Sequence, residues 1–63
     1  MNTNQATEVL RSLTHYPCVL ESAISHYQAL TRVYTPADAL YDTVQYIKAA
    51  NQLEEESHEL SPQ

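Results

Sequence analysis

The residues best suited to chemistry in this chain lie in one short segment, HYPCVLESAISH, residues 15–26. This segment contains His15, the chain's single cysteine Cys18, and His26. Imidazole and thiolate groups bind zinc, and a thiolate beside an imidazole can act as a nucleophile. The segment therefore raises two chemical hypotheses, a zinc site and a cysteine–histidine catalytic pair.

The zinc hypothesis lacks a full set of ligands. Structural zinc sites almost always use four ligands, commonly in two closely spaced pairs. The segment supplies three, and the fourth would have to be His58 or a carboxylate from a distant acidic segment. We therefore expect no metal site.

The catalytic hypothesis depends on Cys18, which follows Pro17 at the expected start of a helix, where the helix dipole favours a thiolate. A catalytic cysteine also needs a shaped pocket and groups that bind an oxyanion. A chain of 63 residues without glycine has little means to build either. We expect no enzyme, no catalytic residue and no cofactor, with Cys18 half-buried as a small apolar residue and both histidines at or near the surface.

The elements that position these residues are expected to be helices. The chain has no glycine, which disfavours tight β-hairpin turns. The steps Tyr16-Pro17 and Thr35-Pro36 divide it into three apolar stretches, because the residue before a proline avoids helical geometry. We predict an all-α three-helix bundle, or a helical hairpin with a short N-terminal helix. The expected helices cover residues 4–15, 17–34 and 36–57.

Caps and apolar spacing support this division. Thr35 is suited to cap the third helix, and Asn4 or Thr3 the first, whereas Pro17 either starts the second helix or kinks a longer one. Apolar residues recur at helical spacing in each segment. The expected core stripes are Ala6, Val9, Leu10 and Leu13, then Leu20, Ala23, Ile24, Tyr27, Thr31 and Tyr34 beside Val19 and Leu30, then Ala37, Leu40, Tyr41, Val44 and Ile47.

The length of the chain allows a single domain, which we place at residues 1–58, followed by a flexible acidic and polar tail at 59–63. A domain this small buries a modest share of its surface, so a partner subunit would help to stabilise it. The first residues lack a signal-peptide pattern, and no apolar stretch reaches the roughly 20 residues that span a bilayer. We expect a cytoplasmic protein without a membrane partner.

The net charge of −5 is concentrated in the second half of the chain. Residues 1–35 carry Glu8 and Glu21 against Arg11 and Arg32, whereas residues 36–63 carry six acidic residues against Lys48 alone. The acidic run at the end of the third helix is either a solubilising tail or a docking surface for a basic partner. A third helix with so little positive charge argues against direct nucleic-acid binding.

Large side chains suggest how a partner would be held. Tyr27, Tyr34 and Tyr41 are spaced by seven and could serve either the core or an interface. A second apolar stripe on the third helix, formed by Tyr46, Ala50, Leu53 and Leu60, has no evident cover within the chain and predicts a homodimer.

These features predict a small acidic helical protein that regulates or inhibits by binding another protein with a basic surface. In size and charge it is similar to small phage and mobile-element inhibitors of host machinery. The alternatives are a nucleic-acid mimic in a basic groove and a structural or adaptor protein that is an obligate dimer. The expected partner-binding residues are Asp38, Tyr41, Asp42, Tyr46, Leu53, Glu54 and Glu55.

Overall fold

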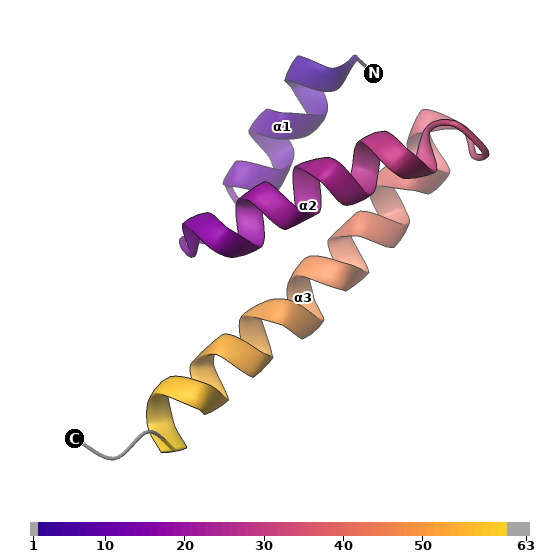
Figure 1. Ribbon diagram of the computed structural model, residues 1–63. Coiled ribbons are helices and arrows are strands. Elements are labelled where there is room, and N and C mark those ends of the chain that lie inside the picture. Colours follow the sequence, from indigo (N-terminus) through magenta and orange to yellow (C-terminus); the bar gives the residue numbers. More distant parts are fainter. Residues whose placement is uncertain (1, 61–63) are drawn as a thin grey trace.

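The chain folds as three α-helices. The computed structural model describes residues 2–60, with side chains for 2–57. Helix α1 spans Thr3–Arg11, α2 spans Pro17–Leu30 and α3 spans Pro36–Leu60 (Figure 1). No strand occurs in this described part of the chain. The predicted all-α three-helix bundle is confirmed.

The helices form an elongated molecule with principal extents of 43 × 18 × 13 Å. Helix α2 turns back onto the N-terminal half of α3, and α1 packs against both (Figure 1). The C-terminal half of α3 diverges from α2 and projects beyond the other two helices. This projection follows from length, because α3 has 25 residues and α1 has nine.

Helix α1 begins one residue earlier and ends four residues earlier than the sequence predicts. Its cap is Asn2, not Thr3 or Asn4: the Asn2 side chain accepts a hydrogen bond from the Gln5 backbone, and the Gln5 side chain accepts one from the Asn2 backbone. The helix stops at Arg11, so residues 12–16 connect it to α2.

Helix α2 is a separate helix and not the continuation of a kinked one. Tyr16 has extended backbone angles, φ −93° and ψ 114°, and Pro17 occupies the first helical turn. At its other end α2 stops at Leu30 rather than at the predicted residue 34. The four residues that follow form a turn, in which the backbone N–H groups of Val33 and Tyr34 donate to the Leu30 carbonyl.

Helix α3 starts as the sequence predicts. The Asp38 backbone N–H donates to the Thr35 hydroxyl at 3.2 Å, and Pro36 is the first helical residue. The helix continues to Leu60, so the first two residues of the expected tail belong to it. Residues 61–63 of that tail lie outside the described residues.

Both connections are made without left-handed backbone geometry. No residue from 2 to 60 has a positive φ angle. A chain without glycine therefore turns twice without a left-handed residue, and the first connection ends in the extended Tyr16 before Pro17.

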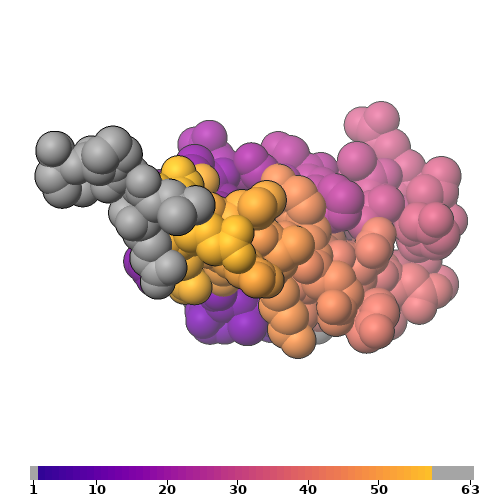
Figure 2. All heavy atoms as spheres, turned by 90° about the horizontal axis from the view of Figure 1, so that it is seen from below, coloured from indigo at the N-terminus to yellow at the C-terminus, as the bar shows by residue number. Residues whose placement is uncertain are grey.

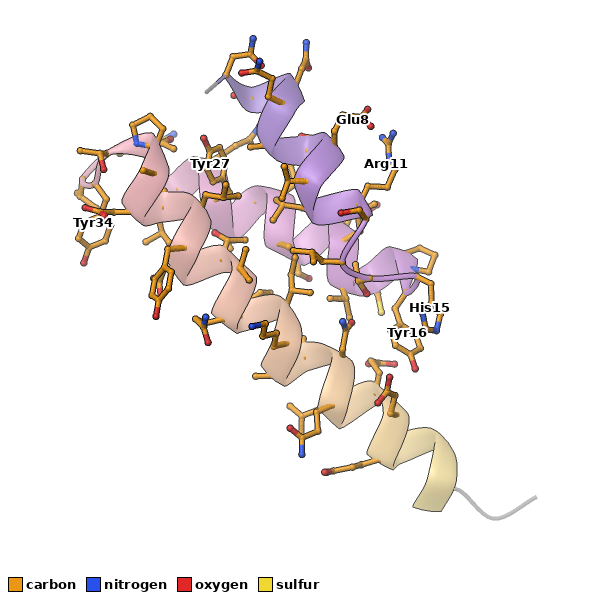
Figure 3. All side chains as sticks on the ribbon, turned by 180° about the vertical axis from the view of Figure 1, so that it is seen from behind. Glu8, Arg11, His15, Tyr16, Tyr27 and Tyr34 are labelled. Atoms are coloured by element: carbon orange, nitrogen blue, oxygen red, sulfur yellow. The ribbon has the colours of Figure 1, made fainter. Side chains whose placement is uncertain are left out.

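The core lies where the three helices meet, and small residues bring the helices together. Tyr27 is buried among all three (Figure 3). Among the described side chains, the buried ones are Ala6, Leu10, Val19, Ala23, Tyr27, Ala39, Thr43 and Ile47.

The predicted core stripe of α3 is correct in part: Ile47 is buried and Leu40 packs against the core, but two of its residues are exposed. Ala37 and Tyr41 are exposed, and the buried side of the helix is formed by Ala39, Thr43 and Ile47. Thr43 is fully buried, and its hydroxyl donates to the Ala39 carbonyl at 2.7 Å. This bond allows the burial, because the hydroxyl is not left without a partner. The expected outer end of the α2 stripe, Thr31 and Tyr34, is exposed as well.

Candidate functional site

The three residues that could bind a metal ion or act in catalysis, His15, Cys18 and His26, do not lie together. His15 lies exposed in the α1–α2 connection and contacts the ring of Tyr16, with ring centroids 4.2 Å apart. Cys18 is exposed in the first turn of α2, and His26 lies two turns further along that helix. Within the described part of the chain, no group of three or more histidine, cysteine or acidic residues could hold a metal ion.

The expectation that Cys18 is half-buried is wrong. Cys18 precedes Val19, which is the residue that turns into the core. Neighbouring positions on a helix point about 100° apart, so the cysteine faces outward. Both histidines lie at or near the surface, as the sequence predicts.

His26 contacts α3, which sequence reasoning did not anticipate. Its ring stacks on that of Tyr46, with centroids 4.8 Å apart and an angle of 14° between the planes. Its Nε2 lies 3.9 Å from a carboxylate oxygen of Asp42. Tyr46 is therefore covered in part from within the chain, and its exposed fraction is 37%.

Three of the predicted partner-binding residues come together at the start of α3. Asp38, Tyr41 and Asp42 line a shallow hollow of about 300 Å³ with Tyr34, which lies in the α2–α3 connection. Tyr34 projects from this connection beside α3 (Figure 3). Both tyrosines keep a large free surface, with exposed fractions of 53% for Tyr34 and 70% for Tyr41.

A second hollow of about 300 Å³ lies further along α3. It is lined by Ala49, Gln52, Leu53 and Glu56. Leu53 is 66% exposed, so it presents apolar surface to the solvent. The predicted stripe of Tyr46, Ala50, Leu53 and Leu60 is not continuous, because Ala50 packs against the core. The Leu60 side chain lies outside the described ones.

The two hollows lie along the same side of α3. Asp38, Asp42, Ala49, Leu53 and Glu56 are separated by four, seven, four and three residues, which is the spacing of one helix face. This face is opposite to the buried positions of the helix. Figure 2 shows the side chains of α3 running across one side of the molecule. We call this surface the outer face of α3.

Glu54 and Glu55 are not part of the outer face. They lie close to Tyr16, which points from the start of α2 toward the C-terminal half of α3 (Figure 3). Partial burial of the phenol, together with the charges of Glu55 and then Glu54, raises the pKa of Tyr16 above its ordinary value. The seven predicted residues therefore do not form one surface.

Asn51 holds Tyr16 in this position, and the sequence carried no signal for it. Its side-chain oxygen accepts a hydrogen bond of 2.6 Å from the Thr14 hydroxyl, and its amide nitrogen donates to the Leu13 carbonyl at 2.9 Å. The Thr14 hydroxyl also accepts from the Tyr16 backbone N–H at 3.2 Å. The α1–α2 connection is thereby fixed against α3.

No helix in the described part of the chain is long and apolar enough to cross a membrane. Comparison of the chain with protein-family models, curated proteins and solved structures found no match.

Proposed function

We propose that this chain acts by binding another protein through the outer face of α3, as a small acidic regulator or inhibitor. The observation that carries the proposal is the composition of this face. Two exposed apolar side chains, Tyr41 and Leu53, each lie beside carboxylates in a shallow hollow.

This composition suits a binding surface for two physical reasons. Exposed tyrosine and leucine side chains contribute binding free energy when a partner removes them from water. Carboxylates at the rim attract a basic partner and raise the association rate. Both features occur on the side of α3 that the bundle does not use for its own packing.

Crosslinking from the outer face tests the proposal. A photoreactive phenylalanine analogue replaces Tyr41 in one variant and Glu8 in a control, since Glu8 is exposed on α1 far along the chain from the outer face. In cells that express the protein, the Tyr41 variant should form a covalent adduct with a specific protein, and the Glu8 control should not. Equal adducts from both positions, or adducts from Glu8 alone, would place the binding surface elsewhere.

Kinetic measurements with the captured partner separate the roles of charge and apolar contact. The double substitution Asp38→Lys and Asp42→Lys should slow association, because steering by opposite charge is lost. The substitution Leu53→Ala should instead speed dissociation, by about 5- to 150-fold if it removes 1–3 kcal/mol of binding free energy. Both sites are exposed, so circular dichroism should show an unchanged helical fold.

Mimicry of nucleic acid is the second candidate, supported by the concentration of negative charge in residues 36–63. A mimic would occupy the basic groove of a nucleic-acid-binding protein. Its affinity should then fall steeply with salt, whereas docking dominated by Tyr41 and Leu53 should weaken only slightly. The idea of a phage or mobile-element inhibitor stays a prediction that size and charge alone support.

A further inference from the structure

We propose that the hollow lined by Tyr34, Asp38, Tyr41 and Asp42 binds the guanidinium group of an arginine on the partner protein. This inference rests on the proposed function and specifies the chemistry of the partner at one site. The charge, the aromatic surface and the shape of the hollow all favour this group.

The two carboxylates of the hollow lie one helical turn apart on the same side of α3. Among the described residues, neither Asp38 nor Asp42 forms an ion pair with a lysine or arginine of the chain. The one basic group paired with them is His26, whose Nε2 lies 3.9 Å from Asp42. The hollow therefore holds two negative charges that no strong cation of the bundle neutralises.

The tyrosines make the hollow selective among cations. A guanidinium group is planar and weakly hydrated, so it can stack on an aromatic face while its N–H groups donate to carboxylates. Tyr34 and Tyr41 supply two aromatic side chains from different segments, the α2–α3 connection and α3 itself. A lysine ammonium would gain the charge attraction but not the stacking of a planar group.

The shape and ligand set exclude other occupants. A calcium ion takes six to eight oxygen ligands, and the side chains that line this hollow provide two carboxylates and two phenol groups. A nucleic acid or a phosphate would be repelled by the same two charges. A shallow hollow of about 300 Å³ at the surface instead accepts a single long side chain entering from solvent.

The test is an NMR titration of the full, ¹⁵N-labelled chain with two blocked dipeptides of equal charge, acetyl-Arg-Arg-amide and acetyl-Lys-Lys-amide. The arginine peptide should shift the amide signals of residues 34–42 in a saturable way. The lysine peptide should bind measurably more weakly, because its ammonium group cannot stack as a planar group on the tyrosine rings. Equal binding of both peptides would show that charge alone acts, and would overturn the proposal.

Charge-matched variants locate the site. Asp38→Asn with Asp42→Asn should abolish the arginine-specific shifts, whereas Glu8→Gln with Glu21→Gln, which removes the same charge from exposed positions of α1 and α2, should leave them. Tyr41→Ala should reduce the preference for arginine while the fold is retained, because the side chain is exposed. Peptide shifts centred on residues 54–57 would also overturn the proposal. An adduct captured from position 41 without arginine-specific shifts would contradict only this inference and leave the proposed function standing.

Discussion

Asn51 of α3 and Thr14 of the α1–α2 connection are joined by a hydrogen bond of 2.6 Å across 37 residues of sequence. The same Asn51 side chain donates to the Leu13 carbonyl at 2.9 Å. One amide group therefore satisfies two polar groups of a connection that has no regular secondary structure of its own. This contact explains why α1 can end early and still stay packed on the bundle.

Replacing Asn51 with alanine should lower the free energy of unfolding by about 1–3 kcal/mol, because two hydrogen bonds of about 0.5–1.5 kcal/mol each are lost. Urea denaturation followed by circular dichroism measures this change. The matched control is Gln52→Ala, an exposed neighbour bonded only to Glu56, which should cost about 0.5 kcal/mol or less. Equal losses in the two variants would show that the Asn51 contact does not stabilise the fold.

Thr43 should tolerate a change of polarity better than a change of size. Thr43→Val keeps the shape of a buried side chain whose hydroxyl bonds only within its own helix, so its cost should stay within about 1.5 kcal/mol. Thr43→Leu adds volume to a fully packed position and should cost about 1–3 kcal/mol. Thermal unfolding of both variants gives the comparison, and a valine variant less stable than the leucine variant would contradict the packing described here.

Stability at alkaline pH should depend on Tyr16. Its pKa is raised in the folded state, so the protonated phenol is favoured by folding. This contribution is present in full below the unfolded pKa of about 10 and is lost as pH rises through that value and the higher folded pKa. Above pH 10, the free energy of unfolding of the wild type should therefore fall relative to that of Tyr16→Phe.

The acidic neighbours provide the control for this pH dependence. In a background with Glu54→Gln and Glu55→Gln, the two charges that help to raise the Tyr16 pKa are absent. The difference between tyrosine and phenylalanine should then change less with pH. Parallel stability curves for the wild type and Tyr16→Phe between pH 9 and 12 would contradict the position of Tyr16 beside α3.

Leu53 should contribute to self-association. Among the described side chains of α3, it is the most exposed large apolar one after Tyr41, and a dimer would remove it from water. Sedimentation equilibrium of the wild type should show a monomer–dimer equilibrium. Leu53→Lys should raise the dissociation constant of the dimer, by about tenfold for every 1.4 kcal/mol of association free energy that is lost. Val33→Lys makes the same charge change at an exposed valine in the α2–α3 connection and should leave the equilibrium unchanged. A wild-type chain that stays monomeric at all concentrations would remove the dimer hypothesis.

Local chemistry explains which parts of the fold could be predicted. The starts of α2 and α3 follow from Pro17 and from Thr35-Pro36, because caps and prolines act within a few residues. The ends of α1 and α2 could not be predicted as well, since a chain without glycine lacks the usual signal for a helix end. The missed Asn2 cap shows the same limit, because Thr3 and Asn4 also have side chains that can cap a helix.

Tertiary contacts explain what could not be predicted. The register of α3 depends on Ala39 and Thr43, whose small or polar side chains give a weak apolar signal although both are buried. At the candidate site, the exposure of Leu53 was predicted from its position on a long helix, whereas Tyr41 was placed in the core stripe and is exposed. The pairing of His26 with Tyr46 joins residues far apart in sequence, and no local pattern encodes it.

The absence of positive φ angles from residues 2–60 has a consequence for mutational scanning. Where a left-handed backbone position exists, most substitutions report strain at that residue rather than the role of its side chain. In this chain every described residue has a φ angle that an ordinary L-amino acid adopts without strain. A saturation library of both connections and of the outer face of α3 should thus measure side-chain contributions directly. Variants that keep their abundance in cells and lose their partner would then mark the binding surface residue by residue.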